Sequence, residues 1–406
     1  MVNYKHALFA ALNLVSGYVV AQKGCTDPYA QNYNPAAKES DGSCIYAPTR
    51  VYPVLKGKMN SAITESSGVV YTSDKLWTHN DSGNPPNIFS IDTATGKTLQ
   101  TVFIDNYPNT DWEDITADGS YIYVEDAGNN NGTRKDLKIL KVKKADIGNG
   151  SVVHVNAEAI SFSYNDQTSF VSSNINNFDC ESVISIRDSL YIFTKDRGDS
   201  NTRVYHLPKT PGNYNISPIM SFHARGLVTG ADYDSVKKEL VLIGYEKNHV
   251  NSFIWIFNNF NNDSFFTGNK RLIEIGSGGI WQTEGICYNG SGKFFISCET
   301  DGLDSASLFE ITSRAWQPKL ASIDNDRNSS NMKVYPNPAQ NFIYIENDLP
   351  INKVSIQNQL GQTLYSENVE NEKFVIETNQ FRHKAGIYYL VVYTATDRYL
   401  QKVVIE

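Results

Sequence analysis

The sequence is poor in methionine, in helix-like apolar periodicity and in long apolar runs. Only 4 of its 406 residues are Met, whereas Tyr and Phe number 24 and 19. Aromatic residues favour strands, and long amphipathic helical patterns are hard to find. After the N-terminal residues, no segment approaches the length of a membrane-spanning helix. The composition indicates an all-β chain with no transmembrane segment in its mature form.

Positive charge is also in short supply. Lys and Arg number 36 against 44 Asp and Glu, which gives a formal net charge of −8. This balance argues against a nucleic-acid partner and suits a soluble surface or a cation ligand. The 7 His and 5 Cys residues form no cluster, so zinc is not predicted.

The first residues have the pattern of an export signal. Lys5 precedes an apolar run over residues 7–20, and Ala21 follows. We interpret residues 1–21 as a Sec-type signal peptide, with a membrane-tethered N-terminus as the alternative. Export permits disulfide bonds.

Residues 24–46 form a small module of turns between two cysteines. We predict a disulfide between Cys25 and Cys44; the other three cysteines have apolar, strand-like surroundings that indicate burial. The module resembles a small Cys-bounded motif of exported proteins from gliding and related Gram-negative bacteria. Its oxygen-bearing side chains could bind Ca²⁺, but the spacing is not that of an EF-hand loop. We favour their interpretation as turn caps; these side chains belong to Asp27, Asn32, Asn34 and Asp41.

A repeat occupies residues 50–315. A polar or acidic residue precedes a short strand, a tight turn follows, and a second apolar strand ends near a carboxylate. The repeat starts at positions 65, 113, 181, 231 and 284, and the second carboxylate follows each start by 13 to 16 residues. This period fits the roughly 40–50 residues of a four-stranded blade. We predict a five-bladed β-propeller whose fifth blade is completed by Val51–Lys56. The alternative is a six-bladed propeller that uses residues 316–323.

The C-terminal part differs in composition. Residues 316–333 are polar and aperiodic, which predicts a linker. In residues 334–406 the side chains alternate in the pattern of β-strands, which predicts a small β-sandwich. This segment resembles the type A C-terminal sorting domain of the type IX secretion system. The motifs that carry the resemblance are Tyr335-Pro-Asn-Pro338, Gly361-Gln-Thr-Leu364, Ala385-Gly-Ile-Tyr-Tyr-Leu390 and Lys402-Val-Val-Ile-Glu406.

The resemblance implies that the type IX machinery is a partner of residues 334–406. It also implies passage through the outer membrane and removal of the domain, with release or surface attachment. We therefore expect an extracellular or outer cell-surface location. The alternative is an ordinary binding sandwich.

In a propeller the innermost strand of each blade lines the axis. Residues at the repeat starts should therefore form a ring around one mouth of the central channel. These residues are Glu65 or Ser67, Glu113, Glu181 and Glu284. A ring of oxygen ligands selects a hard cation, Ca²⁺ before Mg²⁺. We expect a second ring further out to bind the ligand; its residues are Asp81, Asp126, Asp196, Arg197, Glu246 and Glu299.

Two segments of the repeat are similar to Ca²⁺-dependent apyrases, which are five-bladed propellers. They are Glu65-Ser-Ser67-Gly-Val-Val-Tyr71 and Trp112-Glu113. The resemblance implies that Ser67, Glu113, Glu181 and Glu284 are Ca²⁺ ligands. The fourth blade departs from it, because Ala231 stands where a ligand is expected. Thr229 or Asp232 would then serve, and we predict Asp232.

Two classes of function fit this sequence. The first is an exported binding module with channel Ca²⁺, which binds a small molecule or a surface glycan. The second is a Ca²⁺-dependent hydrolase of nucleotide phosphoanhydrides or other phosphoesters; a lactonase or esterase is a weaker variant of it. Basic loop residues such as Arg197 could hold a phosphate in the hydrolase. No catalytic residue is assigned.

Overall fold

The computed structural model describes residues 22–247, 251–276, 282–299, 306–312, 332–358, 363–381, 385–394 and 398–406. The chain divides into two compact units, Met1–Leu320 and Ala321–Glu406, and each is described by itself. The expected signal peptide lies outside the described residues, and so does nearly all of the expected linker. No helix in the described part of the chain is long and apolar enough to cross a membrane.

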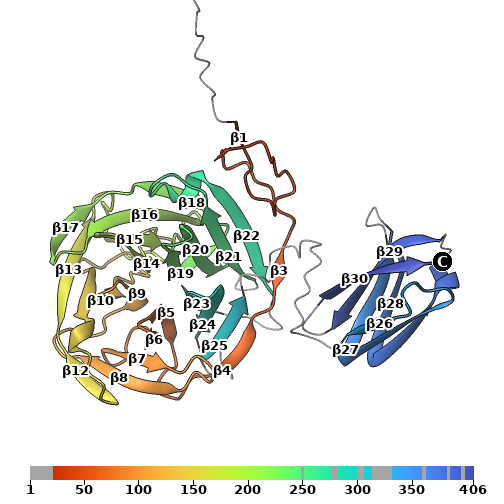
Figure 1. Cartoon of the computed structure of the whole chain (residues 1–406). Helices are drawn as coiled ribbons and strands as arrows, with labels where there is room; N and C mark the ends of the chain where they lie inside the picture. The colour runs from red at the N-terminus through yellow and green to blue at the C-terminus, as the bar shows by residue number, and fades with distance from the viewer. Residues whose placement is uncertain are drawn as a thin grey trace, which may run out of the picture. The chain divides into compact units, whose positions relative to one another are not determined.

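The first unit contains five sheets that stand in a ring around a common axis (Figure 1), within the described residues. We call them blades one to five. Blade one contains β5 (Ser66–Thr72), β6 (Lys75–Asn80), β7 (Asn87–Ile91) and β8 (Thr98–Ile104). Blade two contains β9 (Trp112–Ala117), β10 (Tyr121–Asp126), β11 (Lys138–Lys143) and β13 (Ala157–Tyr164). Blade three contains β14 (Cys180–Ile186), β15 (Ser189–Thr194), β16 (Asn201–Pro208) and β18 (Met220–His223).

The last two blades include the closure of the ring. Blade four contains β19 (Leu227–Asp234), β20 (Glu239–Tyr245), β21 (Ser252–Asn258) and β22 (Asn269–Ile275). Blade five contains β23 (Thr283–Tyr288), β24 (Lys293–Cys298), β25 (Ser307–Thr312) and, from the other end of the unit, β4 (Val54–Lys58). The antiparallel pairing of β4 with β25 shows that an N-terminal strand completes blade five, but it begins at Val54, because Val51 pairs with β22 of blade four. It pairs an edge that would otherwise be open. The alternative sixth blade falls on residues outside the described set.

Three additional strands connect neighbouring blades, and the sequence did not indicate them. Each precedes the outermost strand of one blade but pairs in parallel with the outermost strand of the blade before it. These strands are β12 (Val152–Val155), β17 (Gly212–Ile216) and β3 (Arg50–Val51). Buried apolar clusters also lie between adjacent sheets. One of them joins Val70 and Trp77 of blade one to Trp112 and Ile115 of blade two.

The module at residues 24–46 contains the Cys25–Cys44 disulfide and the short parallel pair β1 (Lys23–Gly24) and β2 (Glu39–Ser40). The three remaining cysteines, Cys180, Cys287 and Cys298, are free and buried, as expected. Asp27, Asn34 and Asp41 each accept a hydrogen bond from a backbone N–H two residues further on, which is the geometry of a turn cap.

The second unit is a sandwich-like sheet, and its two longest strands have 16 and 15 residues. It contains β26 (Lys333–Tyr335), β27 (Phe342–Gln357), β28 (Thr363–Glu377), β29 (Gly386–Thr394) and β30 (Arg398–Ile405). β27 is long enough to pair with both β28 and β29. The side chain of Asn337 bonds the backbone of Lys402 and Val404 at 2.8 Å each, so the Tyr-Pro-Asn-Pro motif holds the last strand.

Candidate functional site

A β-bulge at the start of the innermost strand recurs in all five blades. The pairing register shifts there in each inner hairpin. A bulge inserts an unpaired residue and re-aims its side chain. The residues at this position are Ser67, Glu113, Glu181, Thr229 and Glu284. All five are buried. The predicted inner ring is therefore a set of structurally equivalent positions.

Blade four differs from the prediction at this ring. Thr229 occupies the bulge and donates a hydrogen bond of 2.6 Å to the carbonyl of Thr283. Asp232 lies three residues further along β19, where it accepts the backbone N–H groups of Tyr233 at 2.8 Å and Tyr288 at 2.7 Å. Its carboxylate joins blade four to blade five, and the structure does not bring it to the pocket at the axis.

A glycine signal could have revealed Thr229. The bulged residue is followed by Gly68, Gly230 and Gly285 in three blades. A Cβ atom at Gly230 would lie 2.3 Å from the carbonyl oxygen of Glu284, and one at Gly68 would lie 2.8 Å from the Cα of Asp114. In these three blades the inner strands approach so closely that a Cβ atom after the bulge would clash.

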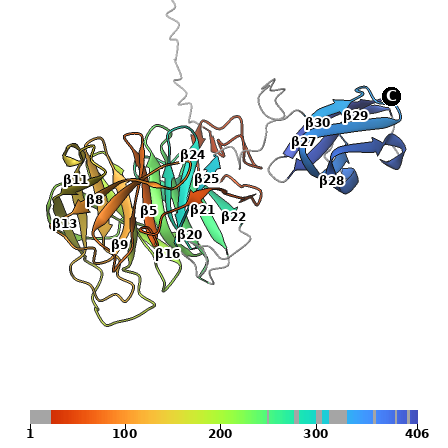
Figure 2. The same cartoon turned by 90° about the horizontal axis from the view of Figure 1, so that it is seen from below.

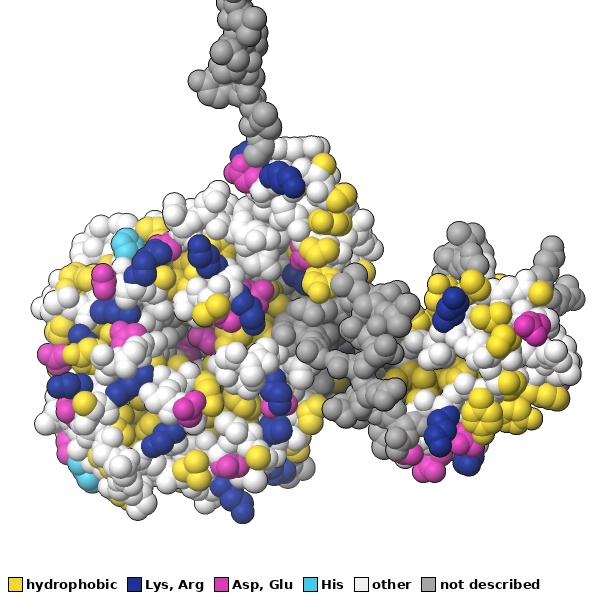
Figure 3. Space-filling model, in the orientation of Figure 1, with side chains coloured by type: hydrophobic (Ala, Val, Ile, Leu, Met, Phe, Trp, Pro, Cys, Tyr) yellow, Lys and Arg dark blue, Asp and Glu magenta, His cyan; other side chains and the backbone are white. Residues whose placement is uncertain are grey.

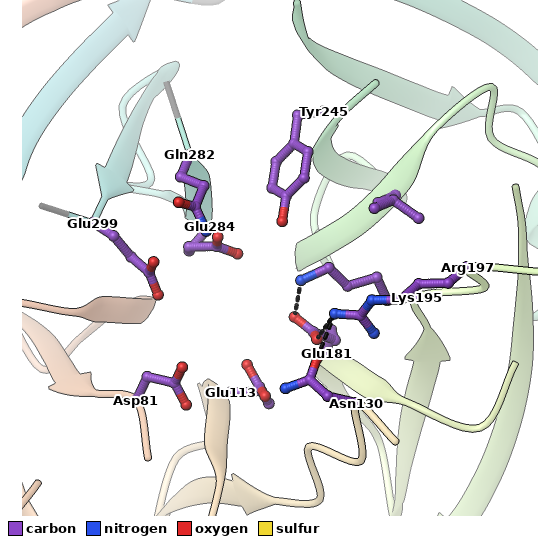
Figure 4. Close-up of a pocket in the computed structure, with 11 residues that line it drawn as sticks. Asp81, Glu113, Asn130, Glu181, Lys195, Arg197, Tyr245, Gln282, Glu284 and Glu299 are labelled. Atoms are coloured by element: carbon purple, nitrogen blue, oxygen red, sulfur yellow. Dashed lines mark hydrogen bonds and ion pairs between the residues drawn. The ribbon is translucent and has the colours of Figure 1, made fainter. Parts of the chain in front are cut away.

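A pocket of about 230 Å³ lies over the bulges. Acidic side chains are visible in the hollow at the centre of the ring (Figure 3), and loops of blades two and three project on one side of the propeller (Figure 2). Figure 4 shows side chains from all five blades pointing into the pocket. They belong to Asp81, Glu113, Asn130, Glu181, Lys195, Arg197, Leu227, Tyr245, Gln282, Glu284 and Glu299.

Two carboxylates of the predicted second ring lie at the pocket, whereas the others are displaced from it by one residue in blades three and four and by two residues in blade two. Asp81 and Glu299 line the pocket, as does Arg197. In blade one, Asp81 directly follows the residue of the second strand that pairs with the residue before the bulge. Lys195 has this position in blade three, and Tyr245 has it in blade four. Side chains alternate between the two faces of a strand, so a one-residue displacement turns a side chain away from the axis.

The three displaced carboxylates have other partners. Asp126 is paired with Arg134 at 2.9 Å and with Lys138 at 3.2 Å. Asp196 is paired with Arg203. Glu246 accepts a hydrogen bond of 2.9 Å from the side chain of Asn251. The structure does not bring Asp126, Asp196 or Glu246 to the pocket.

In blade two the position equivalent to Asp81 is occupied by Gly128. The backbone N–H of Gly128 donates a hydrogen bond of 3.1 Å to the carbonyl of Asp111. In blade one, the N–H of Asp81 donates the equivalent bond, of 2.9 Å, to the carbonyl of Glu65. A Cβ at Gly128 would lie 2.1 Å from Oε1 of Glu113 and 2.7 Å from Asp111. The missing side chain leaves room for these two carboxylates.

Lys195 is a basic group of the pocket, and sequence reasoning counted it only among the basic loop residues that could hold a phosphate. Its Nζ lies 2.9 Å from Oε2 of Glu181, and its side chain is only 7% exposed. Burial alone would lower the pKa of Lys195, but Glu181 and the neighbouring acidic groups raise it well above its usual range. Arg197 lies 3.7 Å from Oε1 of the same Glu181 and also pairs with Asp179. Glu181 is therefore held by two cations.

Two groups of three carboxylates have oxygens within 4.8 Å of one another, and Glu113 belongs to both. The first contains Asp81, Asp111 and Glu113; the second contains Glu113, Asp179 and Glu181. The second group already has Lys195 and Arg197 as ion-pair partners. Among the described side chains, no Lys or Arg forms a direct ion pair with the first group. We call Asp81, Asp111 and Glu113 the acidic triad.

The electrostatics of the acidic triad disfavour three full charges. Burial, followed by the charge of Glu181, raises the pKa of Glu113 well above its usual range. Burial likewise raises the pKa of Asp81 to about 7, with a further contribution from Asp111. Across the pocket, burial and the charge of Asp81 raise the pKa of Glu299 to about 7. A bound cation would relieve this repulsion.

The donor set fits a hard cation. The acidic triad offers carboxylate oxygens, and the hydroxyl of Ser67 lies 3.4 Å from Oε2 of Glu113. No His or Cys belongs to either carboxylate group in the described part of the chain. Oxygen ligands in flexible geometry are the preference of Ca²⁺. Sequence reasoning did not assign Asp111 or Asp179 to the site. Each lies two residues before a bulge, the position that Leu227 and Gln282 have in blades four and five, where those two residues line the pocket.

Comparison with known proteins identifies the C-terminal unit. Residues 333–406 match the family of secretion system C-terminal sorting domains. The chain thus carries the sorting domain that its terminal motifs predict, and this domain indicates export by type IX secretion to the cell surface or the extracellular space. No curated protein sequence matches the chain.

Solved structures resemble this chain at low sequence identity and with low TM-scores. PorZ, a surface component of the type IX secretion system of Porphyromonas gingivalis, is 11% identical with a TM-score of 0.30; the match covers 84% of this chain but only 45% of PorZ. The Bombyx mori β-fructofuranosidase BmSUC1 is 12% identical with a TM-score of 0.41, over 87% of this chain and 88% of that one. The Pan2 WD40 domain of Neurospora crassa is 9% identical with a TM-score of 0.33, over 65% and 97%.

Proposed function

We propose that this chain, which ends in a secretion system sorting domain, is an exported propeller that binds Ca²⁺ at its axis and serves as a binding module. Residues 1–21 would direct the first export step as a Sec signal peptide. Residues 334–406 would then engage the type IX machinery. The mature propeller would act outside the cell or on its surface, with a small molecule or a surface glycan as its partner.

The observation that carries the Ca²⁺ proposal is the acidic triad. Its three carboxylates approach one another without a direct ion-pair partner among the described Lys and Arg side chains. Burying like charges together costs free energy that a divalent cation offsets. Glu113 is the central ligand, because it is the member shared by both carboxylate groups. Ser67, Glu181 and Glu284 occupy equivalent bulges and complete the ring around the ion.

The test is a calcium titration of the purified full chain after treatment with EDTA. We expect Ca²⁺ to bind, by isothermal titration calorimetry, and to raise the melting temperature. Glu113→Gln should weaken binding at least tenfold. Glu125→Gln is the matched control, because Glu125 is also a buried acid of blade two and is not part of either carboxylate group. An absence of binding heat at millimolar Ca²⁺ would remove the proposal.

A second candidate function is supported by Lys195 and Arg197. Both line the same pocket as Asp81 and Glu113 of the acidic triad, so the pocket offers a cation site beside two basic groups. This combination can hold a phosphate between an ion and an Arg fork, as a Ca²⁺-dependent hydrolase of phosphoanhydrides requires. Bound Ca²⁺ would supply Lewis-acid polarisation, while Lys195 and Arg197 would bind and orient the phosphate.

The hydrolase candidate is tested by phosphate release from nucleoside di- and triphosphates in the presence of Ca²⁺. Glu181→Ala and Lys195→Met serve as the comparison variants, since both disrupt the basic side of the pocket. Release by the wild-type chain that both variants lose would favour the hydrolase. Equal background release from all three proteins would leave the binding module as the function.

A further inference from the structure

We propose that the pocket between the Cys25–Cys44 module and blade four is a second binding site, and that its ligand is a neutral saccharide. The pocket measures about 280 Å³. The module contributes Asp27, Tyr29 and Tyr46, and blade four contributes Lys237, Glu239 and Arg271. This volume is near the lower end of the roughly 300–1,000 Å³ range of small-molecule sites, which suits one or two sugar rings.

The module is fixed on blade four, so the walls of this pocket are preformed. The hydroxyl of Ser40 donates a 2.8 Å hydrogen bond to Oδ1 of Asn269, and the amide of Asn259 donates one of 3.3 Å to the hydroxyl of Thr26. Gly42 has a φ of 73°. A Cβ at this glycine would lie 2.7 Å from the carbonyl oxygen of Thr267. The module therefore packs directly against the backbone of the blade, and little ordering is required when a ligand binds.

The charges of the pocket balance. The pocket is lined by two carboxylates, those of Asp27 and Glu239, and by two cations, those of Lys237 and Arg271. The carboxylates are also oriented by tyrosines: Tyr46 donates to Asp27 at 2.6 Å, and Tyr288 donates to Glu239 at 2.8 Å. An anion in this pocket would share it with two carboxylates, and a cation would share it with two basic groups. A neutral ligand with many hydroxyl groups can both donate to the carboxylates and accept from the cations.

The aromatic groups favour a sugar over another neutral polar ligand. The ring of Tyr46 is packed against the guanidinium of Arg271, whose Cζ lies 4.9 Å from the ring centroid. This contact holds one wall of the pocket rigid. Tyr29 lines the same pocket and is half-buried. The C–H face of a pyranose packs on such rings while its hydroxyl groups reach the charged side chains.

This inference does not depend on Ca²⁺ at the axis, because the two pockets have no lining residue in common. It deepens the binding-module function by placing the glycan on the N-terminal module. The binding site would then include a segment that the disulfide closes, and the propeller would serve as its rigid support.

The test is a titration of the full chain with neutral sugars, observed by saturation-transfer difference NMR and calorimetry. The probes are glucose, galactose, mannose, N-acetylglucosamine and their β-linked disaccharides, with galacturonic acid and inorganic phosphate as charged comparisons. We expect at least one neutral probe to bind. Tyr29→Ala should weaken that binding at least tenfold. Tyr33→Ala is the matched control, because Tyr33 belongs to the same module, is 43% exposed and does not line the pocket.

Three results would overturn the proposal: no binding by any neutral probe at 50 mM, binding of the charged probes alone, or equal affinity of the Tyr29→Ala and wild-type chains. The channel variant Glu113→Gln separates the two sites. Sugar binding that persists in this variant and in EDTA supports the module pocket even if the Ca²⁺ proposal fails. Sugar binding that disappears in Glu113→Gln would assign the ligand to the axis and overturn the module site.

Discussion

The ammonium group of Lys195 lies 2.9 Å from a carboxylate oxygen of Glu181, and both side chains are buried at the mouth of the propeller axis. Glu181 and Glu113 occupy the same bulge position in their blades. Of the two, only Glu181 has a Lys partner among the described residues. The protein thus supplies its own cation to one side of the pocket. On the other side, the acidic triad lacks such a partner among the described residues and is left for an exogenous ion.

The first prediction removes this internal cation. Lys195→Met should destabilise the chain in Ca²⁺-free buffer by roughly 3–5 kcal/mol, because the buried carboxylate of Glu181 loses the nearer of its two cationic partners. It should also raise the affinity for Ca²⁺, since the ion no longer competes with an ammonium group. Urea unfolding with and without Ca²⁺ measures both effects.

The control for this variant is Lys293→Met. Lys293 pairs with Glu310 at 3.1 Å, but its side chain is 41% exposed. Exposed pairs of this kind contribute about 0–1 kcal/mol. If Lys195→Met is as stable as Lys293→Met and binds Ca²⁺ no more tightly, Lys195 does not compensate the pocket charge.

The arrangement of strands could be predicted because two signals recur in every blade. Alternating apolar residues define the strands, and tight turns separate them. The fifth blade could be completed from the sequence because β4 had no other partner in its own neighbourhood. The connecting strands β3, β12 and β17 gave no signal, since each is short and pairs with a strand from another repeat.

The candidate site was predicted well where the bulge itself carries a carboxylate and less well at the strand ends. In Thr194-Lys195-Asp196 a charged residue stands at both candidate positions, and only the pairing of Cys180 with Thr194 selects Lys195. A bulge shifts the register by one residue, so counting from the strand start cannot decide which side chain faces the axis. Asp111 and Asp179 were missed for a related reason, because they lie before the paired strand.

The second prediction concerns Gly128. Gly128→Ala should weaken Ca²⁺ binding at least tenfold, because the new methyl group would occupy the position of the Glu113 carboxylate. The matched control is Gly119→Ala in the same blade, where an added Cβ meets nothing within 4 Å. Calorimetric titration of both variants distinguishes them. Equal Ca²⁺ affinity in the two variants would show that Glu113 is not a ligand.

The third prediction separates a structural carboxylate from a ligand. Asp232→Ala should cost about 1–3 kcal/mol for each backbone N–H group that it leaves unsatisfied, that of Tyr233 and that of Tyr288. Its Ca²⁺ affinity should stay within twofold of the wild-type value. Urea unfolding and calcium titration provide the two measurements. A tenfold loss of Ca²⁺ affinity would restore Asp232 to the ligand set.

The fourth prediction concerns pH. Burial raises the pKa of Asp81 and of Glu299 to about 7, well above the value near 4 of an unfolded carboxyl group. The folded state therefore holds more protons than the unfolded state between these two values. The free energy of unfolding should fall as pH rises from about 4 to about 7 when no Ca²⁺ is present.

Calcium should reverse this trend. Metal binding requires ionised carboxylates, so Ca²⁺ affinity should increase over the same pH range. Melting temperatures measured from pH 5 to pH 8 in EDTA should therefore decrease, while those in millimolar Ca²⁺ should decrease less or increase. Other buried acids contribute to the trend in EDTA, because burial also raises the pKa of Glu125 to about 8. The double variant Asp81→Asn, Glu299→Gln isolates the pocket: its melting temperature should depend less on pH than that of the wild-type chain, and an unchanged pH profile would place the titrating groups elsewhere.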